Sequence, residues 1–172
     1  MTPPVPGTRR LTLRGLTRAD VPALVAALDD YAVSKWLTVV PYPYGEADAL
    51  SFLDHLDGAD PLTALGIFDA DGFAGVIGAA DGLGYWLGRA HHGKGYMGEA
   101  AAAMVGQFFD MREADVLTSG YFEGNAASAR VLARLGFVAD GQERVVSRAR
   151  GCEVTLNKVI LTRAVWSAHH GD

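Results

Sequence analysis

Apolar residues between positions 97 and 109 repeat at the spacing of one helical face. The members of this stripe are Met97, Ala100, Ala101, Met104, Val105, Phe108 and Phe109. A glycine-rich stretch precedes the stripe, and the strand-like segment Leu83 to Leu87 precedes the glycines. The pattern therefore predicts a strand, a turn and a long helix whose apolar face belongs to the core.

Three other long segments have helical patterns. One begins at Thr17, where Asp20 completes a capping box. A second runs from Glu46 to Leu56, and a third runs from Asn125 to Gly136. Their inward positions are Val21, Leu24, Val25 and Leu28; Leu50, Leu53 and Leu56; and Val131, Leu132 and Leu135. A short helical turn is expected within Ala32 to Leu37.

Short alternating or continuous apolar runs predict strands. They are Arg9 to Leu13, Leu62 to Phe68, Phe73 to Ala80, Leu83 to Leu87, Asp115 to Tyr121 and two final strands separated by Ala149 to Gly151. The second, third and fourth form an antiparallel meander. The strand from Asp115 lies parallel to the strand at Tyr85 if the long helix is a right-handed crossover between them.

The final strand changes its apolar phase. Val154 and Leu156 lie on one face, whereas Val159 and Leu161 lie on the other. One extra residue would restore a single phase, so we expect a β-bulge near Asn157-Lys158.

Length and composition are those of an ordinary globular protein, with 172 residues, 49% hydrophobic and 20% charged. They support one domain over residues 1–172. The Pro-rich start, residues 1–7, and the polar tail, residues 167–172, are expected to be frayed, with Trp166 packing the end of the chain down.

Charge and cysteine content narrow the class of protein. A net charge of −5 is opposite in sign to the positive charge typical of proteins that bind nucleic acid. The single cysteine, Cys152, excludes an intrachain disulfide and fits a reducing compartment. There is neither an apolar signal region nor a run of about 20 apolar residues. We therefore expect a cytoplasmic protein without nucleic-acid or membrane partners.

The turn before the long helix is the strongest candidate site. Gly93, Gly95 and Gly98 leave room for successive backbone N–H groups to converge on an anion at the positive end of the helix. Lys94 adds a positive charge. The turn therefore predicts a phosphate site, although glycines at such a turn can also be purely structural.

The same glycines match the dinucleotide-binding pattern G-x-G-x-x-G. Context disfavours a Rossmann domain, because antiparallel hairpins precede the motif and too little chain follows it. The acidic ribose partner is also missing, since Ser119 and Gly120 occupy its expected place. A P-loop is excluded because Gly95, rather than Ser or Thr, follows the lysine.

A second motif makes the assignment more specific. The segment Asn125 to Phe137, N-A-A-S-A-R-V-L-A-R-L-G-F, together with Gly84 to Leu87 and His92 to Tyr96, resembles the GNAT superfamily of N-acetyltransferases. The resemblance is to the RimJ/RimL-like branch, the ribosomal-protein N-terminal acetyltransferases. Trp36-Leu37 and Pro41 to Tyr44 are similar to that branch too, so the match covers almost the whole chain.

This resemblance implies an α/β (α+β) fold. Its central sheet would be mixed and mostly antiparallel, with about seven strands flanked by helices. The sheet would splay between its fourth and fifth strands, here Tyr85 to Leu87 and Val116 to Tyr121. Acetyl-CoA, the implied co-substrate, would lie in that gap, and no metal is required.

The resemblance also assigns site residues. The backbone of Trp86 and Leu87 would pair with the pantetheine arm, and Ser128 matches a position proposed to protonate the departing CoA thiolate. The remaining cofactor positions are His92, Gly93, Lys94, Gly95, Tyr96, Met97, Gly98 and Asn125. From the residues alone, Asn125 can equally be a helix N-cap and Ser128 a first-turn residue.

Met97 departs from the branch, which usually has a small residue there. It would crowd the diphosphate unless it turned into the core with Ala101 and Met104, and we expect the inward orientation.

The resulting prediction is an acetyl-CoA-dependent N-acetyltransferase. A primary amine, either a protein N-terminal α-amino group or a small amine, would attack the thioester directly in a ternary complex. The acceptor pocket would be made by Trp36 to Gly45 and the last hairpin. Asp81, Glu123, His91 and Glu46 are candidate bases by position only, and Cys152 is too far from the motif for an acetyl-cysteine intermediate.

Two other classes compete with this prediction. A non-catalytic acyl-CoA-binding sensor or partner module is suggested by Met97 and by the absence of an obvious base. A nicotinamide-dependent oxidoreductase would instead bind NAD. The sequence leaves open the acceptor amine, the general base, the role of Ser128 and the oligomeric state, including a homodimer.

Overall fold

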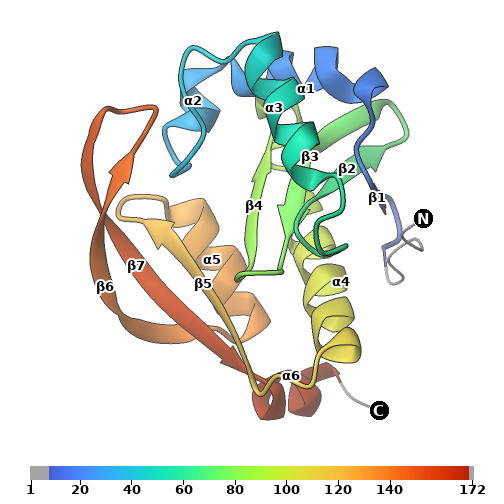
Figure 1. Ribbon diagram of the computed structural model, residues 1–172. Coiled ribbons are helices and arrows are strands. Elements are labelled where there is room, and N and C mark those ends of the chain that lie inside the picture. The colour runs from blue at the N-terminus through green and yellow to red at the C-terminus, as the bar shows by residue number, and fades with distance from the viewer. Residues whose placement is uncertain (1–7, 171–172) are drawn as a thin grey trace.

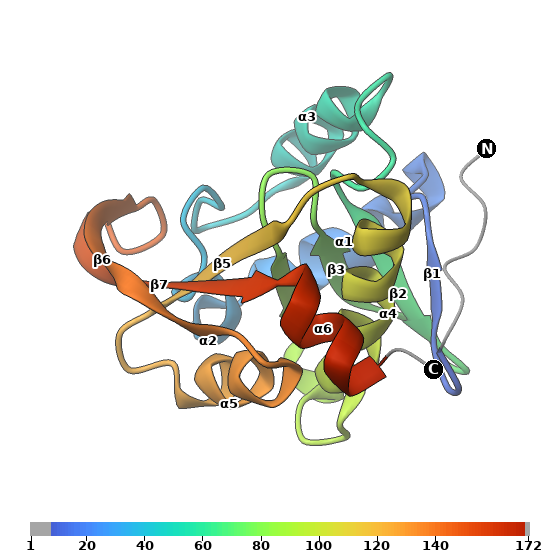
Figure 2. The same cartoon turned by 90° about the horizontal axis from the view of Figure 1, so that it is seen from below.

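Two antiparallel sheets form the frame of the computed structural model, which describes residues 8–170 (Figures 1 and 2). The first has the order β1-β2-β3-β4 and the second the order β5-β7-β6. The strands of the first sheet are β1 (Thr12–Arg14), β2 (Leu65–Asp69), β3 (Gly72–Gly78) and β4 (Gly84–Leu87). Those of the second are β5 (Val116–Phe122), β6 (Val138–Ser147) and β7 (Cys152–Thr162).

A parallel bridge between Leu83 and Ser119 joins the two sheets. The Leu83 N–H donates to the Thr118 carbonyl oxygen at 2.8 Å, and the Ser119 hydroxyl donates to the Leu83 carbonyl oxygen at 2.7 Å. The parallel relation predicted for these segments is thus confirmed. Beyond this point β4 and β5 belong to different sheets, so the splay predicted between the fourth and fifth strands is present.

The close approach at the bridge depends on Gly82, which precedes Leu83. Its φ of 117° is disfavoured for residues that have a β-carbon, and an added β-carbon would lie 3.0 Å from Thr118 Oγ1. A glycine is therefore required where the first sheet meets β5.

In the described range, six α-helices cover the sheets (Figure 1). They are α1 (Val21–Leu28), α2 (Tyr31–Ser34), α3 (Glu46–Leu56), α4 (Tyr96–Met111), α5 (Ala126–Leu135) and α6 (Arg163–His170). Short 3₁₀ helices, η1 (Arg18–Asp20) and η2 (Arg89–His91), precede α1 and α4. The predicted capping residues begin η1, where the Thr17 N–H donates to the Asp20 carboxylate at 2.8 Å.

The core lies on both faces of the first sheet. Val76 packs with apolar residues of α1 to α3, whereas its neighbour Ile77 belongs to the larger core around α4. Successive strand residues point to opposite faces, so this alternation gives each side of the sheet its own helices. All seven residues of the predicted α4 stripe are buried.

The predicted bulge lies on the other strand. β7 pairs with β5 without interruption from Thr162 to Leu156. The irregularity is in β6, where Asp140 and Gly141 lie between the residues paired with Val159 and Asn157. The phase change in β7 has a different cause: Val159 and Leu161 enter the α4 core, whereas Leu156 on the opposite face lines a cleft.

The last described element, α6, is a helix that the sequence pattern did not predict. Trp166 stacks on Phe109 of α4 with ring centroids 6.5 Å apart, which confirms its packing role. The Arg163 guanidinium donates to the carbonyl oxygens of Phe109, at 2.9 Å, and Ala114, at 3.0 Å. These contacts hold α6 against the end of α4, so residues 167–170 are helical rather than frayed. Residues 1–7 and 171–172 lie outside the described part.

Candidate active site

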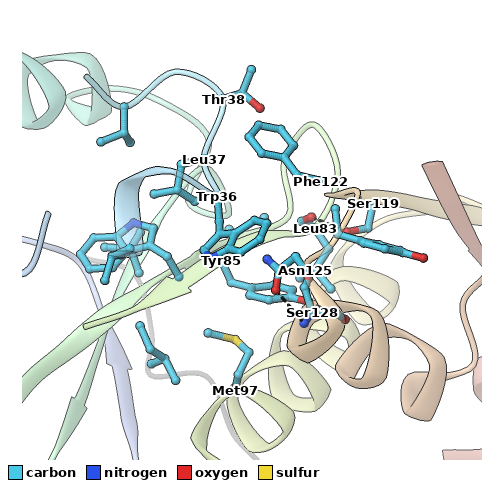
Figure 3. A pocket seen from close by; sticks show the side chains of 18 of the residues that line it. Trp36, Leu37, Thr38, Leu83, Tyr85, Met97, Ser119, Phe122, Asn125 and Ser128 are labelled. Atoms are coloured by element: carbon cyan, nitrogen blue, oxygen red, sulfur yellow. Dashed lines mark hydrogen bonds between the residues drawn. The ribbon is translucent and has the colours of Figure 1, made fainter. Parts of the chain in front are cut away.

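A cleft of about 1790 Å³ opens between β4 and β5. Its walls include β4, the turn before α4, the first turn of α5 and the segment after α2 (Figure 3). This volume exceeds the roughly 300–1,000 Å³ of an ordinary small-molecule pocket. The cleft therefore has room for an extended ligand and a second molecule.

The hydrogen bonds between β4 and β3 show which backbone groups of β4 face the cleft. In an antiparallel pair, alternate residues bond to the neighbouring strand and the residues between them point away. The Gly88 N–H donates to the Ala74 carbonyl oxygen of β3 at 2.8 Å, and Trp86 lies in the same phase. The backbone groups of Tyr85 and Leu87 therefore point into the cleft.

This alternation along β4 changes the expectation that the Trp86 backbone pairs with the pantetheine arm. Its backbone belongs to the ladder with β3, and its indole lies edge-on to Phe73 at 5.9 Å. Leu87 does face the cleft, where its carbonyl oxygen lies 2.8 Å from His92 Nε2. An extended ligand would thus meet the backbone of Tyr85 and Leu87.

The turn before α4 has the strand-turn-helix geometry expected for an anion site. Gly93 and Gly95 have φ angles of 74° and 76°, and Gly95 is the residue immediately before α4. β-Carbons added at Gly93 or Gly98 would meet no atom within 4 Å, so the space beside the turn is open to a ligand. The turn and the N-terminal N–H groups of α4 fit a diphosphate.

Arg10 and Glu99 anchor this turn to the start of the chain. The backbone N–H groups of Arg9 and Arg10 donate to Glu99 Oε1 at 2.6 and 2.7 Å, and Arg10 Nε donates to Oε2 at 2.9 Å. Arg10 Nη1 also donates to the Lys94 carbonyl oxygen at 2.8 Å. Burial raises the pKa of Glu99, but these hydrogen bonds and the Arg10 charge outweigh it and hold the pKa below its ordinary value. Sequence reasoning missed both residues.

Tyr96 bonds the other side of the turn to the β2–β3 hairpin, and His91 lies beside this contact. The Tyr96 hydroxyl donates to Asp69 Oδ2 at 3.1 Å, and His91 Nδ1 lies 3.3 Å from the same oxygen. Burial raises the pKa of Asp69, yet hydrogen bonds from backbone N–H groups and Tyr96 lower it overall. Of the four candidate bases, Asp81 and His91 line the cleft, and His91 lies against this carboxylate.

Asn125, Ser128 and Tyr85 meet across the cleft (Figure 3). Asn125 Oδ1 accepts the Ser128 N–H at 3.3 Å, which confirms Asn125 as the N-cap of α5. Ser128 Oγ lies 2.7 Å from the Tyr85 hydroxyl. Burial raises the pKa of Tyr85 to about 12, with the Ser128 hydrogen bond opposing the rise. The sequence motif contained Tyr85 without indicating this contact.

Met97 has the inward orientation that we expected. Its side chain is 8% exposed and packs in the same core as Ala101 and Met104, at the floor of the cleft. Met97 therefore does not obstruct the turn.

The far end of the cleft is closed by a contact between the segment after α2 and the β6–β7 turn. The Arg148 N–H donates to the Thr38 carbonyl oxygen at 2.9 Å, and Arg150 Nε donates to the Lys35 carbonyl oxygen at 2.7 Å. The Arg150 guanidinium also lies 4.9 Å from the Trp36 ring centroid. The two segments expected to form an acceptor pocket are thus joined.

The aromatic residues of this region divide between lining and packing. Trp36 and Tyr44 both line the cleft, and Tyr44 is only 5% exposed because it also packs with α1 and α3. Tyr42 is 44% exposed and packs against Tyr31.

Two absences hold for residues 8–170. No cluster of three or more His, Cys, Asp or Glu side chains is placed to hold a metal ion. Within the same range, no helix is both long and apolar enough to cross a bilayer.

Residues 10–138 match the family model described as an acetyltransferase (GNAT) domain. The chain belongs to the GNAT acetyltransferase family. It is therefore an acyltransferase that uses acetyl-CoA, and the nicotinamide-dependent alternative is excluded. The chain is 26% identical over 156 residues to the uncharacterized N-acetyltransferase p20 of Bacillus licheniformis, covering 84% of this chain and 88% of that protein.

Solved structures share the fold. A GNAT-family acetyltransferase from Bacillus anthracis has a TM-score of 0.78 at 18% identity, covering 90% of this chain and 96% of that one. RimL, the ribosomal L7/L12 α-N-protein acetyltransferase in complex with coenzyme A, has a TM-score of 0.77 at 20% identity, with coverages of 93% and 98%. The microcin C7 self-immunity acetyltransferase MccE, in complex with acetyl-CoA and AMP, has a TM-score of 0.75 at 19% identity, with coverages of 91% and 97%.

Proposed function

We propose that this enzyme transfers the acetyl group of acetyl-CoA to a primary amine by direct attack in a ternary complex. The acceptor is either a protein N-terminal α-amino group or a small amine. One observation carries the proposal: the cleft edge of β4 leads into the turn before α4 and faces the Asn125–Ser128 cap across the splay.

Different residues of the cleft bind different parts of acetyl-CoA. Tyr85 and Leu87 offer backbone groups to the pantetheine arm. Residues 92–98 and the N-terminus of α4 hold the diphosphate, since converging N–H groups and the helix dipole favour an anion. Lys94 adds a charge, and Asn125 orients the start of α5 beside the thioester.

Acetyl transfer then needs alignment and proton handling. The amine nitrogen forms a bond to the thioester carbonyl carbon, the carbon–sulfur bond breaks, and the electron pair stays on sulfur. The amine nitrogen loses one proton to the solvent in the cleft. Ser128 lies where the sulfur leaves.

The acceptor occupies the opposite end of the cleft, against residues 36–45 and the turn at residues 148–151 that closes this end. RimL, one of the structures with this fold, is named for an α-amino group of a ribosomal protein. That name supports an N-terminal α-amino group as the first acceptor to test. The homodimer stays a prediction, which sedimentation velocity tests.

Thermal unfolding in the presence of acetyl-CoA, CoA or NAD tests the binding step. A ligand that binds the native state raises the midpoint, so both CoA ligands raise it and NAD does not. Gly95→Glu places a negative side chain at the proposed diphosphate site and abolishes the rise. Gly15→Glu adds the same charge at an exposed glycine outside the cleft and preserves it.

Release of free thiol from acetyl-CoA tests the reaction. Peptides with a free N-terminal Ser or Ala, and polyamines such as spermidine, serve as acceptors. Acceleration by at least one amine supports the enzyme. Binding of acetyl-CoA without acceleration by any of them supports the non-catalytic module instead.

A further inference from the structure

The Tyr85 and Ser128 hydroxyl groups form a pair that bridges the two walls of the cleft. Tyr85 belongs to β4 and Ser128 to the first turn of α5, and their oxygen atoms lie 2.7 Å apart. Tyr85 Oη also lies 3.4 Å from the Ser128 carbonyl oxygen. No role follows for Tyr85 from packing alone, because a phenylalanine would fill the same space.

The direction of the hydrogen bond follows from acidity. A phenol ionises near pH 10, whereas an aliphatic hydroxyl is a much weaker acid, so the phenol is the better donor. The Tyr85 hydroxyl has one hydrogen, and its 2.7 Å contact with Ser128 Oγ is much shorter than its 3.4 Å contact with the Ser128 carbonyl oxygen, so this hydrogen is directed to Oγ. When Tyr85 donates to Ser128 Oγ, the Ser128 hydrogen is directed to a third partner in the cleft.

We infer that Tyr85 and Ser128 together form a hydrogen-bonding site for the departing thiolate of CoA, in which Tyr85 is a positioning residue that aims the Ser128 hydroxyl at sulfur. This inference rests on the proposed function, which brings the thioester to Ser128. It assigns the pair to stabilising an anion rather than to delivering a proton.

The pKa values of the CoA thiol and the Tyr85 hydroxyl decide between stabilising the thiolate and protonating it. A thiol ionises near pH 8.5. Burial raises the pKa of Tyr85 to about 12, so a thiolate does not take its proton. The Ser128 hydroxyl, held in place by Tyr85, instead donates a hydrogen bond to the charge that develops on sulfur, as preorganised donors do in other acyl transfers. The amine releases its proton on the acceptor side, and CoA leaves as the thiolate.

Ionisation of CoA bound to the enzyme measures this role without an acceptor. Cys152 is the chain's one cysteine, so Cys152→Ser leaves bound CoA as the sole thiol, and its ultraviolet absorbance reports the thiolate. In the Cys152→Ser protein, the thiol pKa of bound CoA falls below about 8.5, the ordinary value of a thiol. Adding Tyr85→Phe makes the thiol about tenfold less acidic, because the Ser128 hydroxyl is then free to turn away.

Two controls separate this effect from folding and from the local helix dipole. Tyr31→Phe removes an exposed hydroxyl outside the cleft and leaves the thiol titration unchanged. Ser128→Ala makes the thiol less acidic by at least as much as Tyr85→Phe does. Adding Tyr85→Phe to Ser128→Ala changes it little further, because the tyrosine acts through the serine.

Once an acceptor is known, kinetics give a second readout. Tyr85→Phe lowers kcat about tenfold and leaves the KM for acetyl-CoA within about twofold, because the interaction forms as sulfur becomes charged. Identical thiol titrations in the Cys152→Ser protein with and without Tyr85→Phe would overturn the inference while leaving the proposed function intact. Failure of CoA to bind at all would instead contradict the proposed function.

Discussion

Gly95 and Gly98 have different conformations within one motif. Gly95 has a φ of 76°, whereas Gly98 is in the first turn of α4 and has ordinary helical geometry. The spacing of the glycines predicts the turn but not which of them needs the left-handed conformation. The same limit applies to Trp86 and Leu87, because only the ladder with β3 shows which backbone faces the cleft.

Alanine substitutions at the two glycines have opposite effects on stability. Gly95→Ala lowers the free energy of unfolding by about 1–2 kcal/mol, because a β-carbon disfavours positive φ. Gly98→Ala raises it by about 1 kcal/mol, because alanine is the better helix former. Urea unfolding measures both. Acetyl-CoA binding weakens about tenfold in Gly95→Ala, the cost of re-aiming the turn N–H groups by roughly 1.4 kcal/mol. Equal changes in the free energy of unfolding for Gly95→Ala and Gly98→Ala would contradict the different conformations assigned to the two glycines.

Long-range partners at single residues escape a sequence reading. Met97 was predictable because its place in the α4 stripe fixes its direction. Tyr85 and Ser128 are 43 positions apart, and Arg10 and Lys94 are 84 apart, so no local pattern connects them. Such pairs follow only from the fold.

At the scale of elements, the segment just before β1 supports the turn before α4. Arg10 extends from the residues before β1 to the Glu99 carboxylate and the Lys94 carbonyl oxygen. Arg10→Ala therefore weakens acetyl-CoA binding about threefold to tenfold by loosening the turn, an effect of roughly 0.7–1.4 kcal/mol. Isothermal titration calorimetry measures it. Arg9→Ala is the matched control, since the contact of that residue with Glu99 is made by its backbone N–H, and it keeps the wild-type affinity.

Glu99 gives this support a pH dependence. Its pKa is lowered in the folded protein from an ordinary 4.5, so its ionised form contributes stability above pH 4.5, and the contribution is lost as the pH falls through the folded value. Glu99→Gln is therefore destabilised relative to the wild type at pH 7, and the difference narrows below pH 4.5. Urea unfolding at pH 7 and at the lowest pH where both proteins fold tests the sign. A gap that widened in acid would contradict it.

Most elements follow from the sequence, and the exceptions have physical reasons. α3 has the predicted bounds, and Gly136 ends α5 with a φ of 102° as expected. The bulge was misplaced because an apolar phase change reads the same whether the strand is irregular or buried on both faces. α6 was missed because its packing on α4 depends on Arg163 and Trp166, which contact residues far away in the sequence.

At the scale of the whole molecule, the cleft is open between the sheets and closed at its far end. The closing contact places the Arg150 guanidinium between the Trp36 and Phe122 rings, at 4.9 and 5.6 Å from their centroids. The contact joins the segment after α2 to the β6–β7 turn. Under the proposed function, Arg150 fixes the shape of the acceptor side and Arg10 supports the cofactor side.

Arg150→Ala tests this division of the cleft. The KM for the acceptor amine rises about tenfold, a loss of roughly 1.4 kcal/mol of binding, while the dissociation constant of acetyl-CoA stays within about twofold. Initial rates at varied acceptor concentration and acetyl-CoA titrations measure the two. Arg144→Ala, which removes an exposed guanidinium from the same hairpin, changes neither. Loss of acetyl-CoA affinity in Arg150→Ala would show that the two ends are not independent.

Amide hydrogen exchange with and without acetyl-CoA, resolved by residue with NMR, tests the central claim most directly. Acetyl-CoA in the cleft slows exchange at Tyr85 and Leu87, whose N–H groups point into the cleft, and at residues 93–98 of the proposed diphosphate site. Trp86, already paired with β3, changes little, as do β1 and α3. Protection confined to other elements at saturating acetyl-CoA, or slowing at Trp86 but not at Leu87, would contradict the assigned binding site.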